Sequence, residues 1–146
     1  MQLPFVSRTT LDDLQAKHGE LVQEYQNYRR RNTAAREESY LKGSDDAVKA
    51  ILPVYDNLQR ALEQPCQDEA FLTGVRMTLS SLEKALEGLG VTEIPALNQP
   101  FDPNLHEAME HIENPEMGEN TVVRVVRAGF IRDGVVLRHA LVAVAN

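Results

Sequence analysis

The feature that most restricts the fold is a long proline-free stretch near the N-terminus. No proline interrupts the chain from Phe5 to Leu52, and the only glycines inside this stretch are Gly19 and Gly43. A single helix over residues 11–52 would be about 63 Å long at ~1.5 Å per residue. A compact globule made from the whole chain would be only about 38 Å across. We therefore expect this helix to project and to need a partner along its length.

The same stretch carries a regular stripe of apolar and ambivalent residues at alternating steps of three and four. The stripe consists of Leu11, Leu14, His18, Leu21, Tyr25, Tyr28, Asn32 and Ala35. This is an a/d heptad pattern, typical of helices that pair in coiled coils. Polar residues at the positions of His18 and Asn32 lower stability but favour one register and a parallel dimer. The simplest partner is a second copy of the chain.

A wider apolar face follows Gly43, as in the helices of a bundle. Pro53 lies inside this run and predicts a kink or a break. Residues 64–68 contain a proline among polar residues and predict a connection to another helix. That helix has apolar residues at a 3.6-residue period between Phe71 and Leu89. Two such helices from each of two chains predict a four-helix bundle.

The pattern changes after Gly90, where prolines and glycines interrupt any helical period. Two valine-rich runs, residues 121–127 and 135–145, predict β strands, and Asp133-Gly134 between them predicts a hairpin turn. Together they predict a small antiparallel β domain. An exposed apolar patch on this hairpin would mark a protein-binding surface.

Strand alternation gives the predicted hairpin two faces, one packed and one outward. Parity alone does not decide which of four valines face the core. These are Val122, Val126, Val135 and Val144.

The composition argues against several classes of function. The formal charge of −7 disfavours a general binder of nucleic acid or anionic membranes. With 5% aromatic residues and no Trp, a large aromatic pocket is not expected. Cys66 is the only cysteine, so neither an intrachain disulfide nor a multi-cysteine zinc site is expected. Because no membrane span or secretion signal is apparent, we expect a soluble cytoplasmic protein.

The surplus negative charge lies after residue 42. Residues 1–42 hold seven basic and six acidic side chains, whereas residues 43–90 and 91–146 each hold four basic and eight acidic ones. Arg29-Arg30-Arg31 forms a basic cluster in the first segment. It lies at positions e, f and g inside the heptad stripe, whereas a DNA-reading basic region stands outside its zipper. A solvated or partner-contacting face is favoured, and the alternative is a coiled-coil scaffold that contacts nucleic acid through Arg29–Arg31.

A metalloprotease-like segment occurs at His106-Glu107-Ala108-Met109-Glu110-His111. Its two histidines are five residues apart, about 140° on a helix, whereas the zinc motif needs a spacing of four. A polar surface turn or helix is the favoured interpretation, with a metal-dependent hydrolase as the alternative. No phosphate loop, nucleophile elbow or activating partner for Cys66 is present in the sequence. We therefore do not expect an enzyme.

Several segments match one known family in order along the chain. Residues 24–31 (EYQNYRRR) resemble an E-x-x-N-x-x-R-R pattern, and residues 52–62 (LPVYDNLQRAL) resemble L-P-V-x-D-x-L-x-R-A-L. Residues 101–109 (FDPNLHEAM) resemble F-D-P-N-x-H-E-A-M, and residues 133–144 (DGVVLRHALVAV) resemble G-R-v-L-R-P-A-x-V-x-V. These patterns, with a helix like that at residues 74–91, are those of GrpE, the nucleotide exchange factor of DnaK-type chaperones.

The resemblance implies an α+β fold in a parallel homodimer. The implied parts are an N-terminal extension at residues 1–10, a long paired helix at 11–52, short helices of a dimeric four-helix bundle at 53–90, and a C-terminal β domain at 91–146. In this family a β domain binds the ATPase domain of the chaperone, opens its cleft and accelerates ADP release, which supports protein folding and the stress response. No cofactor, metal, nucleic acid, membrane or small-molecule substrate is implied, and the paired helix is implied as a thermosensor.

The resemblance also implies two sets of site residues. Chaperone contact is expected at Val126, Val135, Arg138 and Val144, with holding of the hairpin as the other role for Arg138. Dimerisation is expected at Leu14, Leu21, Tyr25, Tyr28, Leu58, Leu62, Leu79 and Leu82. This chain has Val135 and His139 where many members carry Arg and Pro, and the usual acidic N-terminal tail is nearly absent.

Overall fold

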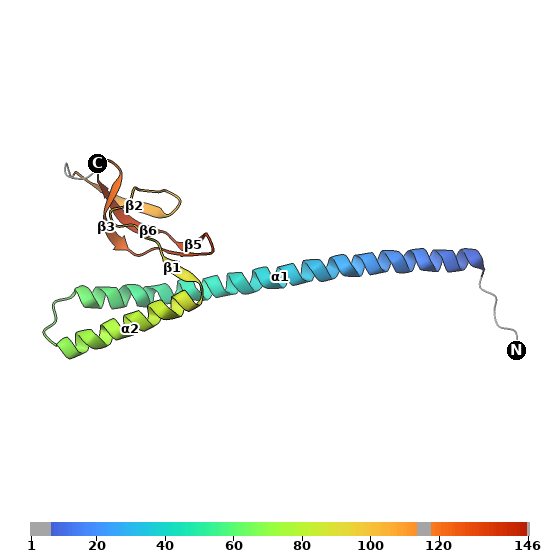
Figure 1. Ribbon diagram of the computed structural model, residues 1–146, viewed down its shortest axis with the longest axis horizontal. Helices are drawn as coiled ribbons and strands as arrows, with labels where there is room; N and C mark the ends of the chain where they lie inside the picture. The colour runs from blue at the N-terminus through green and yellow to red at the C-terminus, as the bar shows by residue number, and fades with distance from the viewer. Residues whose placement is uncertain (1–6, 114–117, 146) are drawn as a thin grey trace. The chain divides into compact units, whose positions relative to one another are not determined.

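The computed structural model describes residues 7–113 and 118–145, and it confirms the predicted α+β fold (Figure 1). Two helices are followed by six strands. They are α1 (Arg8–Glu63), α2 (Glu69–Gly88), β1 (Val91–Glu93), β2 (His106–Ile112), β3 (Thr121–Arg127), β4 (Phe130–Arg132), β5 (Val135–Arg138) and β6 (Ala140–Ala145). The chain divides into two compact units between Ser44 and Asp45. None of the described helices is both long and apolar enough to cross a bilayer.

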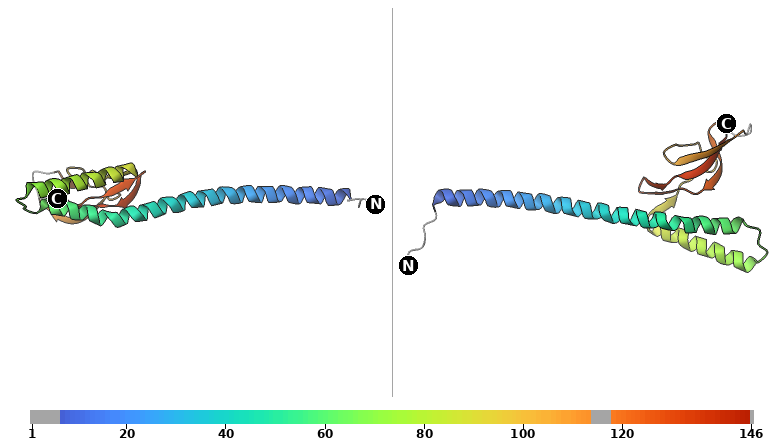
Figure 2. Two further views of the ribbon diagram at one scale, coloured as in Figure 1. Left: turned by 90° about the horizontal axis from the view of Figure 1, so that it is seen from below. Right: turned by 180° about the vertical axis from the view of Figure 1, so that it is seen from behind.

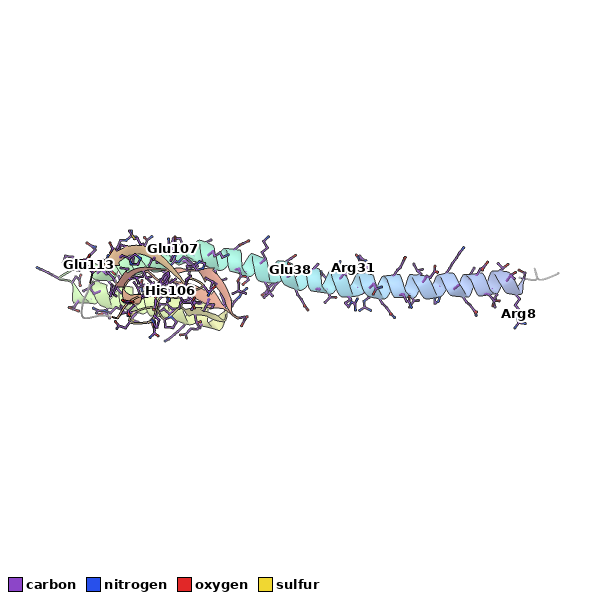
Figure 3. The ribbon with its side chains drawn as sticks, turned by 90° about the horizontal axis from the view of Figure 1, so that it is seen from above. Arg8, Arg31, Glu38, His106, Glu107 and Glu113 are labelled. Atoms are coloured by element: carbon purple, nitrogen blue, oxygen red, sulfur yellow. The ribbon has the colours of Figure 1, made fainter. Side chains whose placement is uncertain are left out.

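The first unit is the N-terminal part of α1. The hydroxyl of Ser7 accepts a hydrogen bond from the backbone N–H of Thr10 at 3.3 Å, which caps the start of the helix. Every side chain from residue 8 to residue 43 is exposed, and Figure 3 shows them projecting around the helix between Arg8 and Glu38. Helices without tertiary packing are marginal in water, so this exposure supports the expectation of a partner.

The helix does not break at Pro53, so of the two predicted outcomes, a kink or a break, the break is wrong. α1 continues through Pro53 to Glu63. The flanking residues Leu52 and Tyr55 are buried against the β strands, and this packing offsets the missing backbone hydrogen bond.

The predicted helix connection at residues 64–68 is confirmed. Asp68 caps α2, since its Oδ1 accepts hydrogen bonds from the backbone N–H groups of Ala70 and Phe71 at 3.0 and 3.1 Å. α2 then runs back beside residues 45–63 of α1 (Figures 1 and 2). Leu86 near its end packs with Leu52 and Tyr55 in one core.

The strands form two three-stranded sheets with the orders β1-β4-β5 and β2-β6-β3. The first is antiparallel, but in the second β2 pairs with β6 in parallel, so the prediction of a purely antiparallel domain is wrong. The predicted turn at Asp133-Gly134 is confirmed by positive φ angles of 49° and 80°. It joins β4 to β5, whereas the predicted partner run at 121–127 pairs with β6. The run at 135–145 divides at His139, because its two halves belong to different sheets.

Each sheet has its own core. The first core joins α1 and α2 to the β1-β4-β5 sheet, and the second lies on the β2-β6-β3 sheet. The first contains Val48, Leu52, Tyr55, Leu86, Val91, Ala128, Phe130 and Leu137. The second contains Ala96, Val122, Ala140, Val142 and Val144, with Phe101 and Val125 packed against it.

The backbone at Gly129, where the chain passes from one sheet to the other, lies very close to the backbone of Ala140. A Cβ placed on Gly129, between β3 and β4, would lie 2.3 Å from the backbone nitrogen of Ala140. Only glycine allows these two segments to approach so closely.

We predict that Gly129→Ala lowers the free energy of unfolding by about 2 kcal/mol or more, because the added methyl overpacks this contact. Gly74→Ala is the matched control, since a Cβ there meets no atom within 4 Å and lies in the interior of α2. It should raise stability by roughly 1 kcal/mol. Urea denaturation followed by circular dichroism measures both, and equal effects of the two variants would contradict the packing argument.

Candidate functional site

The tip of the β4–β5 hairpin presents an apolar side chain to solvent. The left-handed turn at Asp133-Gly134 is followed at once by Val135, the first residue of β5. Val135 is 59% exposed, although its strand neighbour Leu137 is buried in the first core. The hairpin therefore offers a protruding valine on a packed base.

The base of the hairpin is held by Arg138. Its Nη1 and Nη2 donate to the two carboxylate oxygens of Asp56 on α1, both at 2.7 Å. Nε and Nη2 also donate to the carbonyl oxygen of Ala128 at 3.1 and 2.7 Å, and the guanidinium lies 5.6 Å from the ring centroid of Phe130. Of the two roles considered for Arg138, the structure shows it holding the hairpin.

Tyr55 of α1 packs against the same hairpin. Its ring meets Phe130 edge to face, with centroids 5.0 Å apart and planes at 86°. The hydroxyl donates to Glu93 Oε2 and accepts from Gln59 Nε2, both at 3.0 Å. Burial, followed by the negative charge of Glu93, raises the pKa of the Tyr55 phenol. The phenol therefore stays protonated and keeps donating to Glu93.

Among the three valines expected to contact the chaperone, Val126 is exposed as well as Val135. β3 skips Val126 in its pairing with β6, and this irregularity leaves the side chain 43% exposed. Val126 lines a cleft of about 210 Å³ with Leu141 and polar side chains of α1 and β3. Those polar residues are Asp56, Gln59, Arg60, Glu63 and Arg127.

Val144, which was expected to contact the chaperone, is buried. It is 1% exposed and packs in the second core with Val122 and Val142. Its side chain is therefore part of the packing of the β2-β6-β3 sheet, and we no longer expect it to reach a partner. Sequence parity could not separate Val144 from Val126, because the irregular pairing in β3 shifts which residues face outward.

The expected dimerisation residues form two groups. Those of the heptad stripe are all exposed, namely Leu14, Leu21, Tyr25 and Tyr28. Those of the bundle region are half-buried within the chain, namely Leu58, Leu62, Leu79 and Leu82. The first group thus has the greater apolar surface left to cover.

The arginine cluster of α1 is exposed as well. Arg29, Arg30 and Arg31 all face solvent, and the guanidinium of Arg29 lies 6.0 Å from the ring centroid of Tyr25 (Figure 3 labels Arg31). This places Arg29 against the edge of the apolar stripe, where it can also cover the seam of a helix pair.

The histidine segment is a strand, so the prediction of a surface turn or helix is wrong. His106 opens β2 and is buried, whereas His111 is exposed. Nδ1 of His106 accepts the backbone N–H of Asp102 at 3.1 Å. Hydrogen bonds from the backbone and side chain of Asn104 lower the pKa of Asp102. Within residues 7–113 and 118–145, no three acidic, histidine or cysteine side chains gather as a metal site requires.

Comparison with known proteins decides the family. The family model described as GrpE matches residues 6–146. The chain belongs to the GrpE family. It is 42% identical over 126 residues to Protein GrpE of Clostridium acetobutylicum, covering 86% of this chain and 62% of that protein. It is 40% identical over 126 residues to Protein GrpE of Clostridium beijerinckii, covering 86% and 60%.

A relative from another bacterial genus gives the same result. Protein GrpE of Aeromonas hydrophila subsp. hydrophila is 38% identical over 129 residues, covering 86% of this chain and 68% of that protein. The chain spans about three fifths of the length of the clostridial GrpE proteins that it matches. The GrpE resemblance of the sequence segments is thus confirmed.

Two acidic residues of α1 that anchor the hairpin were not predicted from the sequence. Asp56 and Asp45 pair with Arg138 and Arg132 of the hairpin. Their spacing of eleven residues, about three helical turns, was the one signal that both carboxylates share a helix face.

We predict that Arg138→Met lowers the free energy of unfolding by about 3 kcal/mol. The substitution leaves the carboxylate of Asp56, whose side chain is only 19% exposed, without its charged partner. The matched control is Arg124→Met, which breaks the Arg124–Glu110 pair whose side chains are 61% and 42% exposed. That loss should be below about 0.5 kcal/mol. Urea denaturation measures both, and comparable losses would refute the anchoring role of Arg138.

Proposed function

We propose that this chain is a nucleotide exchange factor that binds the ATPase domain of a DnaK-type chaperone and accelerates ADP release. The observation that carries the proposal is Val135, exposed at the tip of a hairpin whose base is fixed to α1 by Arg138. Membership of the GrpE family supports the class of partner. The proposed activity supports protein folding and the stress response in the cytoplasm, and it involves no hydrolysis and no cofactor.

The proposed mechanism is differential binding. A partner that binds the open, nucleotide-free chaperone better than the closed ADP-bound state lowers the affinity for ADP by the same factor. A hairpin that enters an opened cleft as a wedge makes contacts that the closed state does not allow. Val135 and Val126 supply the apolar part of this contact, while Arg138 keeps the wedge on its helix.

Val135 also indicates the chemistry of the contact. Many family members place an Arg at this position, so the resemblance implies an ionic contact that this chain does not make there. Burying an exposed valine contributes roughly 1.5 kcal/mol and is insensitive to salt. We therefore propose an apolar contact at the tip of the hairpin.

The proposal includes a parallel homodimer. The exposed stripe of α1 is covered by the same stripe of a second copy, and the half-buried leucines of α1 and α2 meet in a four-helix bundle. His18 and Asn32 in the stripe weaken the pair, so the paired helix melts at a lower temperature than an all-apolar seam would. This weakness is the proposed basis of temperature sensing.

We predict that the wild-type protein accelerates release of a fluorescent ADP analogue from a DnaK-type chaperone by at least about fivefold in stopped-flow measurements. Val135→Asp should reduce affinity for the chaperone at least about tenfold, because a carboxylate would be buried without a partner. Met77→Asp on the exposed surface of α2 is the control and should bind like the wild type. A wild-type protein that leaves ADP release unchanged would overturn the proposed function.

For the dimer, we predict that His18→Leu raises the midpoint of helix melting by about 5 °C, because an apolar residue replaces a polar one in the seam. Gln26→Leu adds the same side chain outside the stripe and serves as the control, for which no shift is expected. Thermal melts followed at 222 nm measure both variants. Equal shifts would show that helix propensity, not pairing, causes the change.

A further inference from the structure

A second ion pair fastens the hairpin to α1 at its other end. Nη2 of Arg132 lies 2.5 Å from Oδ1 of Asp45, and the two side chains are 9% and 21% exposed. Arg132 is the last residue of β4 and stands directly opposite Val135 in the strand register. Asp45 therefore contacts the tip of the hairpin through an ion pair, whereas Asp56 holds its base through two hydrogen bonds.

The two anchors lie on one face of α1. Eleven residues separate Asp45 from Asp56, a rotation of about three full turns and a rise of roughly 16 Å. Between the anchors, Val48, Leu52 and Tyr55 pack against the hairpin in the first core. The hairpin thus lies along the helix with an ion pair at each end and apolar contacts between them.

These two kinds of contact constrain motion differently. Apolar contacts are non-directional and tolerate sliding or rocking of one surface on another. An ion pair restricts the distance between its two charges, most strongly when both side chains are largely shielded from water, as those of Arg132 and Asp45 are. With the base anchor alone, the hairpin can pivot about Arg138, and the Asp45–Arg132 pair removes this freedom.

We propose that Asp45 and Arg132 are positioning residues that set the angle of the β4–β5 hairpin on α1 and hold Val135 in place for the partner. For its functional part this inference rests on the proposed exchange activity. A fixed wedge fits only the opened chaperone cleft, whereas a pivoting wedge also adapts to the closed one. Pivoting therefore reduces the difference in affinity between the two states, which is the quantity that accelerates ADP release.

The test compares three variants of the full chain. Asp45→Asn removes the charge of the tip anchor, and Asp45→Glu retains a carboxylate that can still reach Arg132. Asp46→Asn is the matched control, since Asp46 is the exposed neighbour on the same helix turn. Two quantities are measured: the ADP-release rate as a function of protein concentration, and amide hydrogen exchange over residues 130–138 without chaperone.

In Asp45→Asn we expect the maximal acceleration to fall at least about fivefold, with a change of less than twofold in the half-saturating concentration. Hydrogen exchange in the hairpin should become faster in the same variant. Asp45→Glu should restore both quantities, and Asp46→Asn should leave both at the wild-type level. A purely stabilising role would instead lower the fraction of competent protein, which raises the apparent half-saturating concentration.

The positioning role is overturned if Asp45→Asn keeps the wild-type maximal rate and hairpin exchange, or if Asp46→Asn changes them equally. If the wild-type protein does not accelerate ADP release, the proposed function fails and hydrogen exchange alone decides the structural claim. Faster exchange confined to Asp45→Asn then supports the anchor, and unchanged exchange refutes it. If Asp45→Asn fails to fold, Arg132→Gln, which removes the charge on the other side of the same pair, is judged by the same criteria.

Discussion

The packing of the 45–146 unit depends on the hydrogen bonds that the guanidinium of Arg138 makes. The guanidinium binds Asp56 on α1 and the carbonyl oxygen of Ala128 between the sheets, and it lies over the ring of Phe130. A charge shielded to this degree is stable only when its hydrogen bonds are satisfied, so the helix, the hairpin and the passage between the sheets must all be in place together. Arg138 and Asp56 are 82 residues apart in the sequence, so their contact depends on the folding of the segments between them.

The hairpin is consequently not an independent module. Its three-residue and four-residue strands bury few side chains of their own, and isolated two-stranded hairpins are marginal in water. Stability comes from Tyr55, Leu52 and Val48 of α1, which fill the space beneath it. The same arrangement leaves Val135 at the tip exposed, on a base whose side chains pack within the chain.

Much of this architecture follows from local sequence signals. The heptad stripe, the connection at residues 64–68 and the Asp133-Gly134 turn each depend on neighbouring residues alone. The errors arose where distant packing decides: buried neighbours keep α1 helical at Pro53, and the run at 135–145 divides between two sheets. The irregular pairing in β3 that exposes Val126 while Val144 is buried has no local signature. Nor does the pairing of Asp45 and Asp56 with the hairpin arginines, since only the helix spacing of the carboxylates is visible in the sequence.

The exposure of every side chain from residue 8 to residue 43 means that nothing in the described chain fixes the length of this segment. For the proposed helix pair, the only repeating requirement on this segment is the phase of the apolar stripe, which returns after seven residues. Whole heptads can therefore be gained or lost at about 10.5 Å each without altering either core. In the proposed dimer the N-terminal segment is a spacer of adjustable length, whereas the segment that carries Asp45 and Asp56 is fixed in length by its ion pairs with Arg132 and Arg138.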